Sequence, residues 1–168
     1  MNFRKTTEKD LESVITIIDE AKEFLKNNNI DQWQNGYPNK EVILKDIEND
    51  NSYVLEDNGE IIATTVVSFD GDKNYDVIHN GAWITDNKYG VIHRIAVSRN
   101  YASRGIGKKI IENSEYIARE NNIKSMRIDT HNDNKTMQRL LLKNGYEYCG
   151  IIFVEDGTER LAFEKELQ

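Results

Sequence analysis

The sequence predicts an α/β fold, a single domain over residues 1–168 built on a mixed β-sheet. Helical and strand-like hydrophobic periodicities alternate along the chain in the order β-α-α-β-β-β-α-β-α-β-β. Two turn signals, Asn58-Gly59 and Asp156-Gly157, each separate a pair of strand-like runs. One proline in 168 residues argues against long irregular linkers.

The first third of the chain is expected to hold one strand and two helices, over about residues 2–5, 8–27 and 40–49. Thr7 is expected to cap the first helix, with Asp10 at its third position, and Asn39 to cap the second. The segment between the helices is loop-like and contains Trp33 and Tyr37.

The rest of the chain is expected to alternate between strands and helices. The predicted strands cover residues 52–56, 60–69, 89–98, 124–130, 146–154 and 159–166. The predicted helices cover residues 105–121 and 134–143. A polar loop containing Trp83 precedes the strand at 89–98.

Composition and charge exclude several classes of protein. The longest nearly apolar run, Ile61–Val67, is far too short to span a membrane. With 22 basic and 29 acidic residues the net charge is −7, so we expect no nucleic-acid partner. The absence of an apolar stretch after Met1 and the single Cys149, which cannot form an internal disulfide, favour the cytoplasm. No Cys/His spacing is typical of a metal site, so no metal is expected.

The segment from Ile92 to Lys109 carries the clearest chemical signal. A buried strand ends, a short turn follows, and a long helix opens on Arg-Gly-Ile-Gly-Lys at 104–108. Backbone N–H groups in the first turn of a helix have no intrahelical partner and attract anions, so this pattern indicates a phosphate cradle. A merely structural tight turn is the alternative. The Rossmann and P-loop motifs are excluded, because Ile110 replaces the third glycine and Lys109 follows Lys108.

Together these features resemble the GNAT superfamily of N-acetyltransferases. The resemblance rests on Ile95-Ala96-Val97, the turn into Arg104-Gly105-Ile106-Gly107-Lys108, then Asn134, and finally Gly145-Tyr146. The order of elements also matches, so the resemblance covers nearly the whole chain. It implies a central, mostly antiparallel mixed sheet with helices on both faces and splayed strands at the cofactor site.

The resemblance also implies acetyl-CoA as cosubstrate and assigns residues to it. The backbone of Ile95, Ala96 and Val97 is expected to bind the pantetheine arm like an added strand. The pyrophosphate is expected on backbone N–H groups of Ala102, Ser103, Arg104, Gly105, Ile106, Gly107 and Lys108. Asn134 is expected to contact the cofactor arm.

Two positions depart from the family pattern. Ala102 stands where the glycine motif usually begins with Arg or Gln, and we expect weakened rather than abolished binding. Leu141 stands where many members carry a Tyr that protonates the leaving thiolate. A thiol with a pKa of about 8.5 leaves tolerably as thiolate near neutral pH, so catalysis can survive. Tyr146 and Tyr148 are possible substitutes that the sequence does not place.

His93 is the leading candidate for the general base. Strand alternation predicts that it shares a face with Ile95, in the neighbourhood from which the family often recruits a base. A core histidine that hydrogen-bonds to a neighbour is the alternative.

For the other polar and aromatic residues, two interpretations remain open. Arg94 and Asp129 are interpreted as a cross-strand ion pair; alternatively, Asp129 and His131 line the acceptor site. Trp33, Tyr37 and Trp83 lie in the least regular segments, where they either line an acceptor pocket or seal the loops onto the core; such rings suit apolar or cationic ligands.

The sequence therefore predicts an acetyl-CoA-dependent N-acetyltransferase in which a primary amine of a small molecule or peptide attacks directly. The alternative is a catalytically degenerate CoA-binding or interaction module, suggested by Ala102 and Leu141. The strand-rich C-terminal hairpin makes a homodimer plausible. The acceptor amine is not identified, because one fold serves many acceptors.

Overall fold

The computed structural model describes residues 1–168, which form two compact units. The first unit comprises Met1–Val67 and Arg94–Asn113, and the second comprises Ser68–His93 and Ser114–Gln168. The boundary passes within two strands and one helix rather than through a linker. The single domain expected over residues 1–168 stays a prediction.

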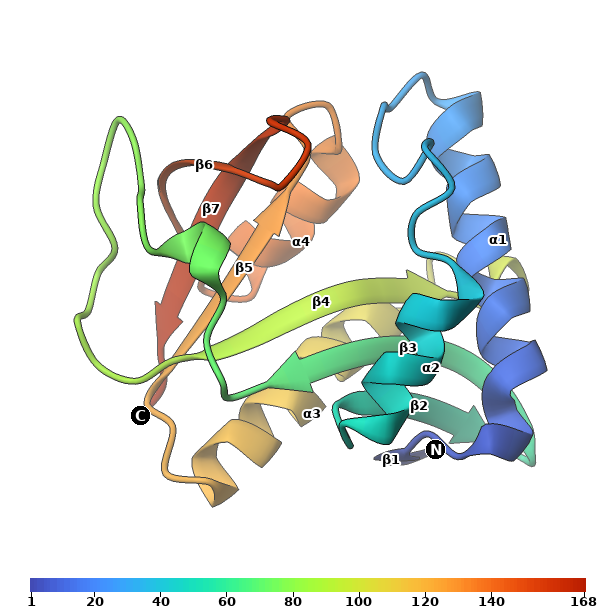
Figure 1. Cartoon of the computed structure of the whole chain (residues 1–168). Coiled ribbons are helices and arrows are strands. Elements are labelled where there is room, and N and C mark those ends of the chain that lie inside the picture. Colours follow the sequence, from blue (N-terminus) through green and yellow to red (C-terminus); the bar gives the residue numbers. More distant parts are fainter. The chain divides into compact units, whose positions relative to one another are not determined.

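Seven strands and four α-helices follow the predicted order (Figure 1). They are β1 Asn2–Lys5, α1 Leu11–Asn27, α2 Lys40–Glu48, β2 Ser52–Asp57, β3 Glu60–Ser68, β4 Gly90–Val97, α3 Ile106–Glu120, β5 Ser125–Thr130, α4 Lys135–Lys143, β6 Glu147–Phe153 and β7 Glu159–Glu166. No helix among them has both the length and the apolar character needed to cross a bilayer.

The strand order is β1-β2-β3-β4-β5-β7-β6. β1 with β2, β2 with β3, β5 with β7 and β6 with β7 pair antiparallel, whereas β4 and β5 pair in parallel. This arrangement confirms the predicted mixed, mostly antiparallel sheet. The sequence pattern did not predict that β7 lies between β5 and β6.

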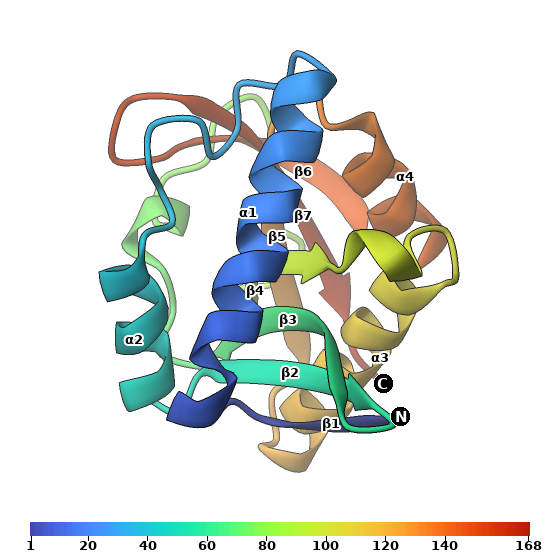
Figure 2. The same ribbon diagram turned by 90° about the vertical axis from the view of Figure 1, so that its right-hand side faces the viewer.

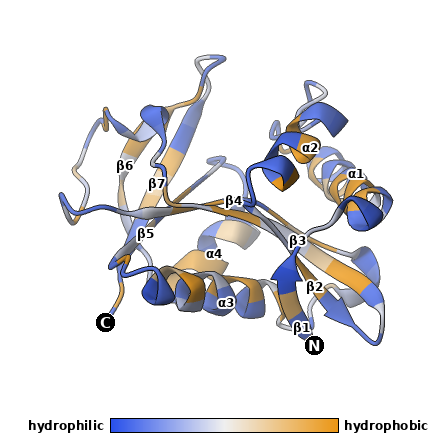
Figure 3. Ribbon diagram, turned by 60° about the horizontal axis from the view of Figure 1, so that its bottom comes forward, coloured by the Kyte–Doolittle hydropathy of each residue, from blue (hydrophilic) through white to orange (hydrophobic).

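In the first unit, helices cover both faces of the sheet. Adjacent residues of a strand point to opposite faces, so Val54 and Leu55 of β2 belong to different cores. Val54 packs with α1 and α2, whereas Leu55 packs with Ile106 and Ile110 of α3. Figures 2 and 3 show α1 and α2 on one side of β2 and β3, and Figure 3 shows α3 on the other.

The predicted cap of the second helix is confirmed, whereas that of the first is wrong. The Asn39 side chain accepts from the Val42 N–H at 2.9 Å at the start of α2. Thr7 instead precedes a 3₁₀ turn, where its backbone N–H donates to Asp10 Oδ2 at 2.8 Å, and Asp10 is the N-cap of α1. Residues Glu8–Asp10 form a 3₁₀ turn, so α1 begins at Leu11 rather than at the predicted residue 8. Arg4 binds the Asp10 carboxylate at 2.8 Å, which ties this turn to β1.

The predicted hairpin between β2 and β3 is confirmed. Asn58 and Gly59 both have positive φ, at 50° and 82°. Two consecutive residues of this kind form the type I′ turn, whose twist matches that of the flanking strands. The Asn-Gly pair therefore specified both the position and the geometry of this turn.

In the second unit, the segment 69–89 packs on the sheet through a buried ion pair. Arg127 of β5 donates from Nε to Glu164 Oε1 of β7 at 3.0 Å, and the two residues are 5% and 0% exposed. Ser125 and Thr85 also donate to this carboxylate. The Arg127 guanidinium lies 4.2 Å from the ring centre of Trp83 and 3.9 Å from that of Tyr89.

Removing one charge of this pair should destabilise the second unit. Burial raises the pKa of Glu164, but hydrogen bonds from Ser125 and Arg127 outweigh it and lower the pKa overall. Glu164→Gln leaves the Arg127 charge buried without a counter-ion, and we expect a loss of roughly 3 kcal/mol in unfolding free energy. Urea unfolding measures this free energy, and Glu166→Gln, at an exposed position of the same strand, is the control. Equal stability of the two variants would contradict this view.

Asp10 should make stability depend on acid pH. The hydrogen bond from Arg4 lowers the pKa of Asp10 from 3.8 to about 2. A carboxylate whose pKa is depressed in the folded state stabilises above its unfolded value, and this contribution disappears as pH falls from 3.8 to about 2. We expect Asp10→Asn to remove this part of the pH dependence of the unfolding free energy, and Asp19→Asn, exposed on α1, to retain it. If the unfolding free energies of wild type and Asp10→Asn depended on pH in the same way, the assigned role of Asp10 would be refuted.

Candidate functional site

The turn that precedes α3 is shaped for an anion. Ser103 and Gly105 adopt positive φ, at 61° and 73°, and residues 102–105 are exposed. The first helical hydrogen bond of α3 runs from the Lys109 N–H to the Gly105 carbonyl at 3.3 Å. The N–H groups of Ile106, Gly107 and Lys108 therefore have no acceptor within the helix. Such groups can bind a phosphate through the backbone alone.

Ionic contacts hold this turn to the rest of the first unit. Arg99 donates from Nε to Glu20 Oε2 of α1 at 2.8 Å, and its Nη2 reaches Glu23. The Tyr101 hydroxyl donates to Glu60 at 3.0 Å, and the guanidinium of Arg104 lies 5.2 Å from the Tyr101 ring centre. Arg99 is thus engaged structurally, whereas the exposed Arg104 remains available for a charged ligand.

β4 pairs with β5 only near the start of the strand. Its parallel pairing with β5 covers only Gly90 with Met126 and Val91 with Arg127. The predicted pantetheine segment, Ile95–Val97, lies beyond this paired stretch. In the first unit Ile95 and Val97 pack with the core around Leu55, and Ala96 packs with the core around Val54.

Arg94 marks the point at which β4 becomes irregular. Its φ is +52°, an uncommon value for a residue with a side chain. Its guanidinium forms a two-pronged pair with Asp46 of α2, from Nε to Oδ2 at 2.9 Å and from Nη2 to Oδ1 at 2.6 Å. Nη1 also donates to the Tyr37 hydroxyl at 2.7 Å.

The predicted ion pair between Arg94 and Asp129 is wrong. Arg94 binds Asp46, whereas Asp129 accepts a 2.6 Å hydrogen bond from the Tyr75 hydroxyl. The prediction was based on the expectation that these two charged residues lie in adjacent central strands. The structure instead pairs Arg94 with a residue of α2. Asp46 was detectable in the sequence as a charged residue three positions after Ile43, on the inward face of its helix.

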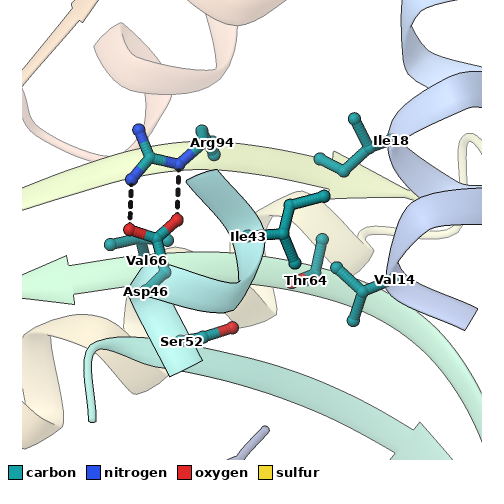
Figure 4. Close-up of a pocket in the computed structure, with 8 residues that line it drawn as sticks. All are labelled: Val14, Ile18, Ile43, Asp46, Ser52, Thr64, Val66 and Arg94. Atoms are coloured by element: carbon teal, nitrogen blue, oxygen red, sulfur yellow. Dashed lines mark hydrogen bonds and ion pairs between the residues drawn. The ribbon is translucent and has the colours of Figure 1, made fainter. Parts of the chain in front are cut away.

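The pair formed by Arg94 and Asp46 borders a small cavity in the first unit. Its other lining residues are Val14, Ile18, Ile43, Ser52, Thr64 and Val66 (Figure 4). The cavity volume is about 10 Å³, which suits one water molecule. It is therefore part of the packing of α1 and α2 and not a substrate pocket.

His93 lies on the second-unit side of the irregular residue. Its Nε2 is 3.0 Å from Asp72 Oδ2, and the two side chains are 27% and 17% exposed. The positive φ of Arg94 breaks the alternation on which a shared face of His93 and Ile95 was predicted. The partner Asp72 gave no periodic signal in the sequence, because it lies in an irregular loop.

The other cofactor and acceptor candidates are capping or loop residues of the second unit. Asn134 is 8% exposed and caps α4, where its side chain accepts from the Met137 N–H at 3.1 Å. His131 Nδ1 accepts from the Asp133 N–H at 3.0 Å. Its position supports a loop-stabilising role.

The three predicted pocket aromatics differ in their surroundings. Trp33, at φ +62°, packs against the core between α1 and α2, and Tyr37 is 45% exposed. Trp83 donates from Nε1 to the Tyr75 carbonyl at 2.8 Å and stacks on Arg127. Trp83 therefore seals its loop onto the sheet, whereas Tyr37 keeps an accessible ring.

The residues considered for acid or nucleophilic roles are largely buried. Leu141 is fully buried, and Tyr146 is 2% exposed. Burial and the nearby Glu115 raise the pKa of Tyr146 well above its usual value. Burial raises the pKa of Cys149 to about 11, which keeps its thiol protonated. Tyr148, by contrast, is half exposed and lies edge-on to Phe163.

Comparison with known proteins identifies the family. The acetyltransferase (GNAT) family model matches residues 17–146. The chain is 25% identical over 162 residues to the uncharacterized N-acetyltransferase YesJ of Bacillus subtilis (strain 168), covering 94% of this chain and 86% of that protein.

Solved structures agree with this match. A GNAT-family acetyltransferase from Streptococcus agalactiae 2603 superposes with a TM-score of 0.91 at 31% identity, over 99% of this chain and 95% of the other. A GNAT-family acetyltransferase from Listeria monocytogenes 4b F2365 shares the fold, with a TM-score of 0.76 at 20% identity over 99% and 94% of the two chains. With a glycine turn suited to an anion and a family match over most of its length, the chain belongs to the GNAT family of acetyltransferases.

Proposed function

We propose that this acetyltransferase transfers an acetyl group from acetyl-CoA to a primary amine of a small molecule or peptide by direct attack. The observation that carries the proposal is the set of N–H groups of Ile106, Gly107 and Lys108, which α3 leaves without helical acceptors beside an exposed glycine turn. Three backbone donors of this kind match the anionic pyrophosphate of CoA.

The residues present fit the cofactor. A side chain at Gly105 would point into open space, so the surface of the turn is accessible to a ligand. Backbone groups of Ile95–Val97 would hold the pantetheine arm, with Arg104 and Lys108 adding charge near the pyrophosphate and Asn134 contacting the arm. When bound, acetyl-CoA supplies an acetyl group activated as a thioester. Ala102 costs little in this scheme, because a backbone donor does not depend on the side chain.

The acceptor amine must lose a proton before it attacks. At a pKa of about 10.4, only about one amine in 2,500 is neutral at pH 7, a deficit of roughly 4–5 kcal/mol. We assign the base to His93, whose imidazole is partly exposed and held by Asp72 at 3.0 Å. A positioned base of this type contributes about 10²–10⁴-fold in rate.

For the acceptor amine we propose only a chemical class. The half-exposed Tyr37, bonded to Arg94, offers an aromatic edge to an apolar or cationic amine. The net charge of −7 disfavours acidic acceptors. Leu141 supplies no proton for the leaving thiolate, and a thiol of pKa about 8.5 can leave without one.

A second candidate function is a CoA-binding module without catalysis, favoured by the fully buried Leu141 at the usual acid position. The alternative includes an interaction module, and a surface is available for one. Exposed apolar side chains of α4 and β6, among them Leu142 and Tyr148, border an open hollow of about 360 Å³.

The homodimer expected from the C-terminal hairpin stays a prediction.

Gly107→Glu should abolish cofactor binding. Glutamate suits a helix better than glycine, so the fold should tolerate the change, while its carboxylate repels the pyrophosphate. We expect calorimetric titration with acetyl-CoA to show micromolar binding to wild type and at least a hundredfold weaker binding to the variant. Tyr116→Glu, at an exposed position of the same helix, is the charge-matched control and should bind like wild type. Equal binding by all three proteins would place the cofactor elsewhere.

His93→Ala should separate catalysis from cofactor binding. We expect turnover of spermidine, 2-phenylethylamine or a peptide with an unblocked N-terminus to fall about 10²–10⁴-fold, with the Kd for acetyl-CoA unchanged. His79→Ala, which leaves the backbone bridge to Ile151 intact, should keep its activity. Binding of acetyl-CoA by wild type without turnover of any amine would favour the module without catalysis.

A further inference from the structure

The carboxylate of Asp72 is held from two sides in the second unit. Its Oδ1 accepts the backbone N–H of Asn74 at 2.9 Å, and its Oδ2 lies 3.0 Å from Nε2 of His93. Its backbone N–H donates to the Tyr89 hydroxyl at 3.2 Å. The orientation of the carboxylate is therefore fixed by the loop and not by the histidine.

This geometry determines which nitrogen of His93 carries the proton. An ionised carboxylate only accepts hydrogen bonds, so the nitrogen facing it must donate. Neutral His93 is therefore protonated at Nε2, and its basic lone pair resides on Nδ1.

We propose that Asp72 is a positioning residue of the acetyl transfer, which fixes His93 in the tautomer whose Nδ1 accepts the proton of the amine. This inference rests on the proposed function of His93 as base. It assigns a role to the loop between β3 and β4 that neither the glycine turn nor the order of elements indicates.

The hydroxyl groups of two tyrosines near the pair bond to other groups. Tyr75, whose ring centre is 6.2 Å from that of His93, donates its hydroxyl to Asp129 of β5 at 2.6 Å. Burial, and then the charge of Asp129, raise the pKa of Tyr75 well above its usual value, so this hydroxyl stays protonated. The Tyr89 hydroxyl contacts the backbone of Asp72 and not its carboxylate. The carboxylate of Asp72 lies within hydrogen-bond distance of the His93 ring, at 3.0 Å.

The variant Asp72→Asn tests whether Asp72 sets the tautomer of His93. The N–H of Asn74 still requires an oxygen, so the new amide should keep its carbonyl at the Oδ1 position. Its NH₂ group then faces His93 and donates, which forces Nε2 to become the acceptor and moves the proton to Nδ1. The variant is nearly isosteric with wild type, yet its Nδ1 carries a proton and can no longer accept one from the amine.

The experiment combines imidazole NMR with kinetics. Long-range ¹H–¹⁵N correlation, recorded at a pH where the spectrum shows the neutral imidazole, identifies the protonated nitrogen, and His93→Ala assigns the signal among the three histidines. We expect an Nε2 proton in wild type, an Nδ1 proton in Asp72→Asn, a fall in kcat of about 10²–10⁴-fold, and an unchanged Kd for acetyl-CoA. A wild-type proton on Nδ1, or a kcat for Asp72→Asn within about twofold of wild type, would overturn the proposal.

A matched control separates positioning from general damage to the loop. Asp76→Asn makes the same chemical change at an exposed position four residues further on, and it should keep both the wild-type tautomer and kcat. The tautomer readout needs no turnover. A wild type that acetylates none of the amines would thus contradict the proposed function, while NMR still decides whether Asp72 sets the tautomer.

Discussion

A strained residue in β4 is held in place by a partly buried, two-pronged ion pair. A positive φ costs Arg94 about 1–2 kcal/mol, and its two-pronged pair with Asp46, together with the hydrogen bond to Tyr37, offsets that cost. This irregular residue lies between the stretch that pairs with β5 and Ile95–Val97, the segment proposed to hold the cofactor arm.

A second polar anchor supports the other half of the proposed chemistry. Segment 69–89 has little regular structure, and a loop of this length in a compact protein usually serves a function. Glu164 and Arg127 fix it to the sheet through Thr85 and two aromatic rings. The same segment carries Asp72 to His93. The buried pair therefore stabilises the loop that we propose to orient the base.

The donor and acceptor sides of the reaction are specified by different kinds of structure. Backbone N–H groups at the start of α3 can hold an anion whatever the neighbouring side chains are, which explains how Ala102 is compatible with cofactor binding. Side chains on loops can vary without changing the fold. Membership of the family therefore assigns acetyl transfer, whereas the roles of Tyr37 and His93 toward the amine are our proposal.

The sequence by itself determined the order of elements, the capping residue Asn39, the Asn58-Gly59 turn and the glycine turn before α3. All of these depend on local geometry: hydrophobic period, caps and residues that tolerate positive φ. Only the tertiary structure decided the partners of Arg94 and His93, because Asp46 and Asp72 are 48 and 21 residues away in sequence. No local pattern predicts such contacts; Arg94 also breaks the alternation from which its neighbours' directions were inferred. Charged side chains take their partners from the packing of distant segments, and packing is not encoded in any short stretch of chain.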